Sequence, residues 1–291
     1  MSFLEKIRLK ADLTNNRFSQ NGEEAMIGQM LTLLPENPKI VEFGGSRGLD
    51  NSNALVHAVG GHADLIMIEG NPKRFEELER NTVKIPRVTP ILARVGIDPE
   101  VNSLEFILRS KKIDPSRVCG VSIDVDGDDA LLLENLGITP SFVVVEYNPT
   151  LALDGFYRNP PGQHVGNNLS ELLRVGRHLG FFPAGLTGTN LFLVANGLSD
   201  KILEIDVLRE ANKLDNPKFG IGYDGTIVRF SGKQITTMEV MDTGWSHTIF
   251  VQPLPKFMRN LGGGPYGRNW ANILRRVVSG IGAFVLRPRH T

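Results

Sequence analysis

Apolar and polar positions follow two alternating patterns between residue 22 and about residue 197. Short runs of apolar, often β-branched residues are separated by segments in which apolar residues recur every three or four positions. The runs indicate buried strands, and the spacing indicates helices that pack on them. The expected strands are 39–43, 63–70, 87–96, 118–127, 141–148 and 189–196. The expected helices are 21–34, 52–59, 72–82, 101–111, 129–137 and 169–180. This alternation predicts an α/β fold in which helices cover both faces of a parallel sheet.

The pattern changes after residue 197, where glycine and aspartate become frequent. The runs 225–230, 236–241 and 248–254 are typical of short antiparallel strands, and a glycine run at 262–264 follows them. We therefore expect one domain over 1–197 and a second part over 198–291. The second part is predicted to be a small β-rich appendage that ends in an amphipathic helix.

The final segment, 268–290, has apolar residues at helical spacing with arginines beside them. Two interpretations fit this pattern. The helix could dock on the body of the protein or in a homo-oligomer, which we favour. It could also lie on an anionic membrane surface as a peripheral contact.

Composition narrows the class of protein. The 291 residues carry no net charge, but five arginines and no acid follow Pro265, so a basic tail joins a mildly acidic body. The single cysteine, Cys119, excludes an intrachain disulfide and a four-cysteine zinc site. The first residues contain no apolar core of signal-peptide length, and no run approaches the ~20 apolar residues of a membrane span. We expect a cytoplasmic protein.

Polar residues and glycines come directly after several expected strands, in EFGGSRG (42–48), IEGN (68–71), DVDGDD (124–129) and EYNP (146–149). The carboxyl ends of parallel strands are where α/β sheets bind ligands. The glycine stretch alone is as typical of a tight turn as of a ligand site. Glu69 ends the next strand, where a carboxylate can accept hydrogen bonds from ribose hydroxyls. The two stretches together favour a nucleotide-like cofactor.

The acids of SIDVDGDD (122–129) allow several interpretations. An EF-hand is excluded, because glycine is not at the sixth position and glutamate is not at the twelfth. If the strand runs through this stretch, Asp124 and Asp126 project on one face. With Glu146 and Asn148 they could then hold Mg²⁺, or they could serve as base and orienting group. We also expect Asp128 or Asp129 to cap the next helix, which leaves Asp124 and Asp126 unexplained.

Five motifs occur in order: FSQNGEE (18–24), VEFGGSRG, MIEGN, SIDVDGDD and EYNP. This series resembles FkbM-type methyltransferases, class I enzymes that use S-adenosylmethionine and often act on sugar hydroxyls of polysaccharides, glycolipids and natural products. The likeness covers about 18–197, and its glycine spacing is E-x-G-G-x-x-G where dinucleotide enzymes have G-x-G-x-x-G. It implies a Rossmann-like class I methyltransferase sheet. The extra acids Asp128 and Asp129 depart from the family pattern, and 198–291 matches none of its motifs.

The resemblance also implies roles for individual residues. Glu42 and the glycines would line the methionine end of the cofactor, Glu69 would bind the ribose, and Asp124 would lie beside the transferred methyl group. The expected cofactor-binding residues are Glu42, Phe43, Gly44, Gly45, Gly48, Asn53, Glu69, Gly70, Asn71 and Asp124. The expected catalytic residues are Asp124, Asp126, Glu146 and His164. His164 is included because it lies in a Gly/Pro/Asn loop directly after EYNP, where a lid and a general base are expected.

The function predicted from the sequence is methyl transfer from S-adenosylmethionine to a sugar hydroxyl, as in polysaccharide biosynthesis. The expected partner is a carbohydrate-containing acceptor. Nucleic acid is not expected, because the core is acidic and no basic-aromatic stripe follows the strand ends. Two alternatives remain. One is a cofactor-binding module without catalysis. The other is a nicotinamide-dependent oxidoreductase, which the glycine spacing disfavours.

Overall fold

The computed structural model describes residues 6–153, 155–160 and 163–214, together with the backbone of five short strands further on. The chain divides into two compact units, Met1–Leu214 and Asp215–Thr291. The first unit thus extends beyond the domain end predicted at 197. It includes helix α7 (Val207–Ala211), and Ile7 forms backbone hydrogen bonds with Lys201 and Leu203.

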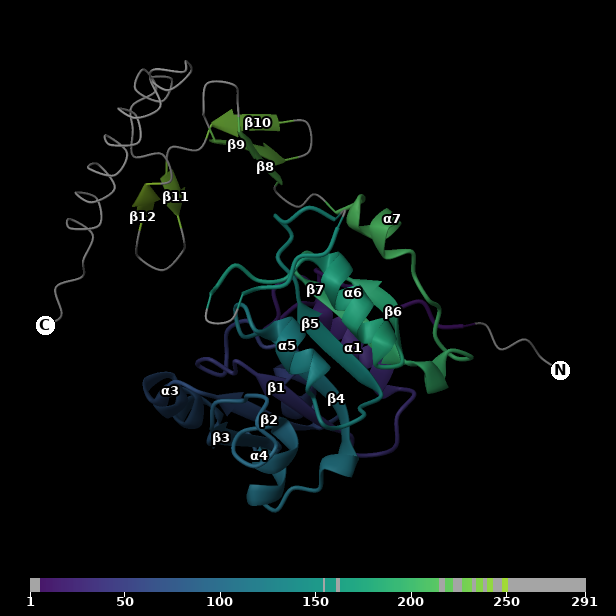
Figure 1. The fold of residues 1–291 in the computed structure, drawn as a ribbon. Coiled ribbons are helices and arrows are strands. Elements are labelled where there is room, and N and C mark those ends of the chain that lie inside the picture. Colours follow the sequence, from purple (N-terminus) through teal and green to yellow (C-terminus); the bar gives the residue numbers. More distant parts are fainter. Residues whose placement is uncertain are drawn as a thin grey trace, which may run out of the picture. The chain divides into compact units, whose positions relative to one another are not determined.

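The first unit is built on a seven-stranded sheet (Figure 1). Its strands are β1 (Lys39–Phe43), β2 (Asp64–Glu69), β3 (Val88–Leu92), β4 (Val118–Ile123), β5 (Phe142–Glu146), β6 (Phe181–Leu186) and β7 (Asn190–Ala195). They are arranged in the order β3-β2-β1-β4-β5-β7-β6. Strands β1 to β5 pair in parallel, and β7 is antiparallel to both of its neighbours. This is a Rossmann-like α/β sheet, as predicted.

The direction of β7 and both edge strands of the sheet differ from the prediction. Strand β7 is antiparallel rather than parallel, because β6, which was not predicted, forms a hairpin with it. Pro183 and Gly185 interrupt the apolar run of β6, and the pairing register shifts between them. A proline is tolerated there because β6 is an edge strand. The other edge strand, β3, likewise contains Pro90 and stops at Leu92 instead of residue 96.

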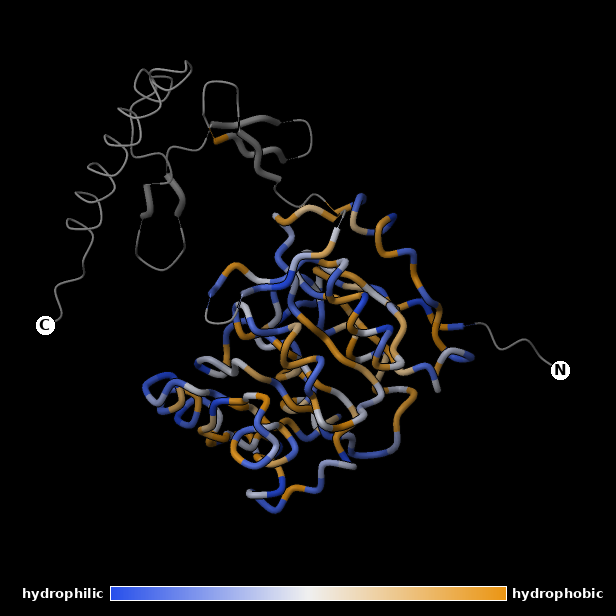
Figure 2. The backbone as a smooth tube through the Cα atoms, in the orientation of Figure 1, coloured by the Kyte–Doolittle hydropathy of each residue, from blue (hydrophilic) through white to orange (hydrophobic). Residues whose placement is uncertain are grey.

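Helices cover both faces of the sheet, as expected. Helices α1 (Glu23–Leu31), α2 (Leu55–Val59) and α3 (Pro72–Thr82) supply the apolar layer on one face. Helices α4 (Leu104–Ser110), α5 (Asp129–Glu134), α6 (Leu169–His178) and α7 supply the layer on the other face. Figure 2 shows hydrophobic residues concentrated along the strands between these layers.

The alternation of side chains along each strand decides which polar groups share a face. Ile40 and Met67 pack with α1, α2 and α3, whereas Val41 and Phe43 pack on the opposite face. By the same alternation, five polar side chains face the α1–α3 layer near the carboxyl ends of β1, β2, β4 and β5 and the start of β7. They are Glu42, Glu69, Ser122, Glu146 and Asn190.

The described part of the second unit consists of antiparallel strands, as predicted. Strands β8 (Lys218–Ile221), β9 (Ile227–Ser231) and β10 (Gln234–Thr237) form one sheet in the order β10-β9-β8, and β11 (Val240–Asp242) pairs with β12 (Thr248–Phe250). The predicted terminal helix, 268–290, lies outside the described residues.

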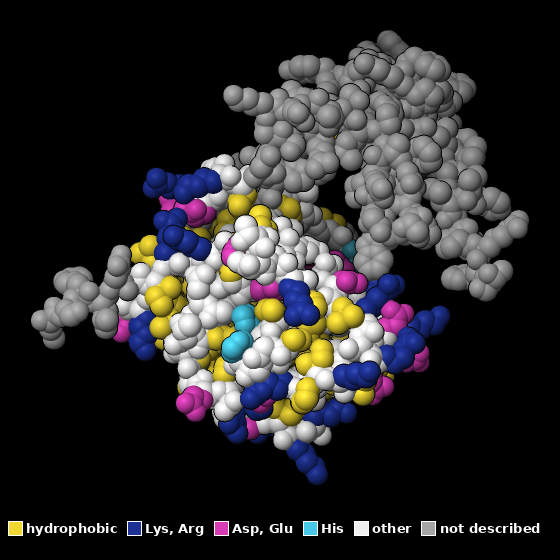
Figure 3. Space-filling model, turned by 180° about the vertical axis from the view of Figure 1, so that it is seen from behind, with side chains coloured by type: hydrophobic (Ala, Val, Ile, Leu, Met, Phe, Trp, Pro, Cys, Tyr) yellow, Lys and Arg dark blue, Asp and Glu magenta, His cyan; other side chains and the backbone are white. Residues whose placement is uncertain are grey.

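The surface of the first unit mixes charge and apolar character. On the face shown in Figure 3, Lys and Arg side chains are scattered among hydrophobic and acidic ones. Within the described residues, no helix is long and apolar enough to span a bilayer.

Candidate active site

Glu42, at the end of β1, is buried and binds the segment that leads into α2. Its carboxylate accepts hydrogen bonds from Ser52 Oγ at 2.7 Å and from the Asn53 backbone N–H at 3.0 Å. Burial raises the pKa of Glu42 to about 7, and these hydrogen bonds oppose the rise. The Asn53 side chain in turn donates to Ser122 Oγ on β4 at 3.1 Å. The first acid of EFGGSRG therefore joins β1, α2 and β4.

The glycines of EFGGSRG are required by the protein itself. Gly44 has φ +68°, and a Cβ there would lie 1.9 Å from the backbone oxygen of Asp124. Gly48 has φ +84°, and a Cβ there would lie 2.6 Å from Leu78. Gly45 donates its N–H to Ile68 O on β2 at 3.2 Å. The turn therefore packs against β2, α3 and the end of β4, so Gly44 and Gly48 do not by themselves demonstrate a ligand.

Glu69, the expected ribose-binding acid, is only 5% exposed at the end of β2. One carboxylate oxygen accepts from the Ser46 N–H at 2.9 Å, and the other accepts from the Asn71 N–H at 2.7 Å. Asn71 itself caps α3 by accepting from Lys73 N and Arg74 N, and Gly70 is exposed. The structure thus brings Glu69 to the glycine turn. Phe43 instead packs in the apolar layer on the other face.

The stretch after β4 forms a turn rather than a strand. Strand β4 ends at Ile123, and Asp126 has φ +58°, in the left-handed region that a non-glycine residue rarely adopts. The prediction that Asp124 and Asp126 share one face of a strand is therefore wrong. The turn nevertheless brings them together, because one carboxylate oxygen each from Asp124, Asp126 and Glu146 lie within 4.8 Å of one another.

Asp129 holds this turn from inside. Its carboxylate accepts from the Val125 N–H at 2.9 Å and from the Gly127 N–H at 3.0 Å. Burial raises the pKa of Asp129 to about 7. Asp128 precedes α5 without a capping hydrogen bond from its side chain. The expectation that one of these two acids caps the helix is wrong, because Asp129 bonds backwards to the turn.

The carboxyl groups of Asp124 and Glu146 lie close together, with one oxygen of each within 4.8 Å of the other. Burial and the charge of Asp124 raise the pKa of Glu146 far above its usual range. Burial, followed by the charge of Asp126, raises the pKa of Asp124. Both pKa values are raised because burial and the neighbouring charges make the two groups resist ionising together. Three such oxygens also match the hard ligands that Mg²⁺ or Ca²⁺ accepts.

Asn148 and His164 contact the backbone around the acids. Asn148 Oδ1 accepts from the backbone and side chain of Thr150, and its Nδ2 donates to Val165 O at 2.7 Å. His164 is exposed, and its Nδ1 lies 3.1 Å from the backbone oxygen of Asp126. We call residues 124–129 the acidic turn. Asn148 therefore shapes the loop after β5, and His164 lies at the rim of the acidic turn.

Glu23 is a buried carboxylate that the sequence analysis did not single out. It accepts from Thr187 Oγ1 at 2.6 Å and from Asn190 Nδ2 at 3.0 Å, and its charge contributes to the raised pKa of Asp124. Asn190 is the register partner of Glu146 on β7. The only signal for Glu23 in the sequence was its place in the motif FSQNGEE.

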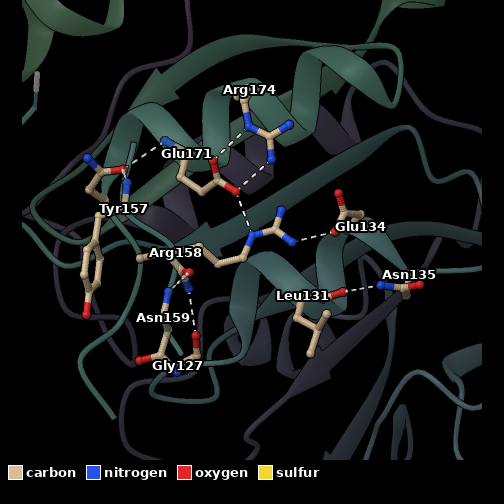
Figure 4. A network of polar contacts seen from close by, with 11 residues as sticks. Gly127, Leu131, Glu134, Asn135, Tyr157, Arg158, Asn159, Glu171 and Arg174 are labelled. Atoms are coloured by element: carbon tan, nitrogen blue, oxygen red, sulfur yellow. Dashed lines mark hydrogen bonds and ion pairs between the residues drawn. The ribbon is translucent and has the colours of Figure 1, made fainter. Parts of the chain in front are cut away.

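The loop after β5 is fastened to the helices on the α4–α7 face. Arg158 donates to Glu134 of α5 and to Glu171 of α6, each at 2.7 Å, and Glu171 also pairs with Arg174 (Figure 4). Glu171 is buried, and its ion pairs with the two arginines lower its pKa. This loop contains His164 and contacts the acidic turn through His164 and Asn167.

No protein-family model matches the sequence, and no curated protein matches it. Solved structures similar to the chain include the CurJ carbon methyltransferase, with TM-score 0.42 and 13% identity over 59% of this chain and 52% of that one. The N-terminal domain of EvdMO1 with SAH bound is similar with TM-score 0.40 and 14% identity, over 61% of this chain and 82% of that one. A TehB-like SAM-dependent methyltransferase from Corynebacterium glutamicum is similar with TM-score 0.39 and 12% identity, over 62% of this chain and 90% of that one.

The chain spans about half the length of CurJ and of the citrinin polyketide synthase CMeT domain. The activities and acceptors of these proteins therefore do not carry over to it.

Proposed function

We propose that this protein transfers a methyl group from S-adenosylmethionine to an oxygen atom, and that the acceptor is a sugar hydroxyl. One observation carries the proposal. Acidic groups from the ends of β1, β2, β4 and β5 gather at the carboxyl edge of the sheet, where α/β proteins bind their ligands. The FkbM-like order of the motifs supports the choice of cofactor and of acceptor class.

The cofactor would be held by the ends of β1 and β2. Glu69 uses one acceptor position on each oxygen for Ser46 and Asn71. An ionised carboxylate has about four such positions, so capacity for ribose hydroxyls remains. The short turn Gly44–Gly48 lies beside it. These residues fit a nucleoside-containing group.

The acceptor hydroxyl would bind at Asp124 and Glu146. When bound, S-adenosylmethionine supplies a methyl group on a positively charged sulfur. Asp124 would orient the hydroxyl and accept its proton, because a buried carboxylate with a raised pKa is a stronger base than an exposed one. Glu146, whose raised pKa favours its protonated form, would donate a hydrogen bond to Asp124. Asp126 would add negative charge at the exposed rim, where His164 is a second candidate base.

A divalent cation held by Asp124, Asp126 and Glu146 would offset their negative charge and acidify a bound hydroxyl. Turnover measured with Mg²⁺ and then with EDTA tests this part of the proposal.

The cofactor assignment is tested by calorimetry with S-adenosylmethionine and S-adenosylhomocysteine. We expect micromolar affinity that falls at least tenfold in Glu69→Gln. Glutamine keeps an acceptor for the Ser46 or Asn71 N–H, which alanine would not. Glu79→Gln on the exposed side of α3 is the matched control and should bind like the wild type. Absence of binding to both compounds would overturn the proposal, and binding of NAD would then favour the oxidoreductase.

The acceptor class is tested by incubating the protein and S-adenosylmethionine with a panel of free and glycosidic sugars and measuring S-adenosylhomocysteine release. Release above the no-acceptor rate supports a sugar acceptor. Cofactor binding without release on any acceptor would favour a binding module.

The cytoplasmic location and the role of 268–290 are also proposals. Flotation of the full chain with anionic vesicles tests peripheral membrane contact. Light scattering at several concentrations tests for a homo-oligomer.

A further inference from the structure

The loop after β5 is shaped by asparagine side chains. We call residues 155–160 and 163–168 the asparagine loop. Asn159 Oδ1 accepts from the Val165 N–H at 3.0 Å, and its Nδ2 donates to Gln163 O at 2.8 Å. Asn168 Nδ2 donates to the carbonyls of Ala152 and Gly155. The side chains thus replace the backbone pairing that a helix or strand would supply.

Asn167 differs from the other asparagines because it joins the loop to the acidic turn. It is 1% exposed. Its Nδ2 donates to Gly127 O at 2.8 Å, and its Oδ1 accepts from the Asn159 N–H at 2.9 Å. Its own carbonyl accepts from the Asn148 N–H at 2.9 Å, two residues beyond Glu146. One residue therefore connects the turn after β4, the end of β5 and the loop.

The backbone of the acidic turn is held from two sides. On one side, the Asp129 carboxylate accepts hydrogen bonds from two backbone N–H groups of the turn. Asn167 and His164 bind the successive carbonyls of Gly127 and Asp126. Gly127 also packs tightly on the loop, since a Cβ there would lie 2.5 Å from Gln163 O.

Two effects disfavour the conformation that these contacts hold. Asp126 adopts a left-handed backbone conformation, which strains a non-glycine residue. Its carboxylate also lies near those of Asp124 and Glu146 and repels them. A strained turn that gathers like charges persists only where surrounding contacts enforce it. The buried hydrogen bond from Asn167 is such a contact.

We propose that Asn167 is a positioning residue for the methyl transfer proposed above: it holds the acidic turn so that Asp126 lies against Asp124 and Glu146. This inference rests on the proposed function for its catalytic consequence, but its structural part can be tested without cofactor or acceptor.

The structural test is a double-mutant cycle in the full chain, read as thermal midpoints. Asn167→Ala is made in the wild type and in Asp126→Asn. In the wild type, loss of the hydrogen bond is partly offset because the carboxylates can separate. Asp126→Asn has already removed that repulsion. We therefore expect the midpoint to fall by about 3 °C more in the Asp126→Asn background. Asn167→Ser, whose hydroxyl is too short to reach Gly127 O, replaces Asn167→Ala if the latter does not fold.

Asn168→Ala is the matched control. It removes buried amide hydrogen bonds of the same loop, but its partners are Ala152, Gly155, Tyr157 and Glu171, outside the acidic turn. Its effect on the midpoint should be the same in both backgrounds to within about 1 °C. Equal losses for Asn167→Ala in both backgrounds, or the same coupling for Asn168→Ala, would overturn the proposal.

The catalytic test uses the acceptor found in the sugar panel. We expect Asn167→Ala to lower kcat at least tenfold and to leave the KM for S-adenosylmethionine within twofold, with kcat of Asn168→Ala within threefold of the wild type. Thermal coupling without an effect on kcat would overturn the positioning role in catalysis. If the wild-type protein binds neither S-adenosylmethionine nor S-adenosylhomocysteine, the proposed function fails, and the thermal cycle alone decides how the turn is held.

Discussion

In one half of the carboxyl edge, the ends of β1 and β2 stabilise buried negative charge, whereas in the other half the ends of β4 and β5 bring negative charges together. At the ends of β1 and β2, the carboxylates of Glu42 and Glu69 accept hydrogen bonds from backbone N–H groups and a hydroxyl. At the ends of β4 and β5, Asp124, Asp126 and Glu146 lie close together, and burial with the neighbouring charges raises the pKa of Asp124 and of Glu146. The first half has the features of a preformed binding surface. The second is electrostatically unfavourable in the free protein, which is a property of functional sites more than of structural ones.

The largest expected effect is on the β4–β5 half. Asp124→Asn removes the proposed base and should lower methyl transfer by about 100-fold or more, the usual contribution of such a group. The same change should maintain or raise the thermal midpoint, because it removes like-charge repulsion. S-adenosylhomocysteine release and thermal unfolding measure the two effects. Asp128→Asn, in the same turn but without a capping bond, is the control and should retain activity. Full activity of Asp124→Asn would exclude its role as base.

The next effect concerns the contact between the two halves. Gly44→Ala would bring a Cβ into the backbone oxygen of Asp124, at a left-handed φ. We expect a loss of about 3 kcal/mol in the free energy of unfolding, from the overpacking and the backbone strain together. Gly61→Ala is the matched control, since Gly61 has a similar φ of +76° and open space around it. Its loss should be about 1 kcal/mol, from the backbone strain alone. Urea unfolding measures both, and equal losses would contradict the close approach.

A pH-dependent effect of at most similar size tests whether the β1–β2 half also contains an unfavourable buried charge. Burial raises the pKa of Glu42 from 4.5 to about 7. The folded state therefore takes up a proton between these values, and the stabilisation is complete below pH 4.5 and lost as pH rises through about 7. Glu42→Gln, which cannot titrate, should reduce the fall in unfolding free energy over this window by up to about 3 kcal/mol. Urea unfolding at several pH values measures the slope. Glu79→Gln should leave the slope unchanged.

The smallest effect is on the loop that covers the β4–β5 half. Arg158→Lys keeps the charge but cannot bind Glu134 and Glu171 together with the same geometry. We expect a loss of about 1 kcal/mol, since Arg158 is partly exposed and solvent weakens its ion pairs. Arg109→Lys, in an exposed pair within one helix, should change the free energy of unfolding by less than about 0.5 kcal/mol. A larger loss for Arg109→Lys than for Arg158→Lys would contradict the expectation that the less exposed ion pairs contribute more to stability.

The sequence predicted the β1–β2 half better than the β4–β5 half. Glu42 and Glu69 come directly after apolar runs, so their position at the sheet edge follows from local pattern. The proximity of Asp124 and Asp126 was predicted for a wrong reason, because Asp129 ends the strand at Ile123 by binding the backbone of the turn. The hydrogen bond from Asn167 to Gly127 spans 40 residues and leaves no periodic signal. Strand β6 was missed because Pro183 and Gly185 interrupt its apolar run.

The bond between Glu23 and Asn190 has a consequence for synthesis of the chain. These partners are 167 residues apart, and β7, which begins with Asn190, is inserted between β5 and β6. Strands β1 to β5 leave the ribosome before β6 and β7, because the chain is synthesised from its N-terminus. Glu23 then remains a buried charge without its partners until the β6–β7 hairpin has left the exit tunnel. The partners of Glu23 are therefore available only after β1 to β5 and α1 to α6 have been synthesised.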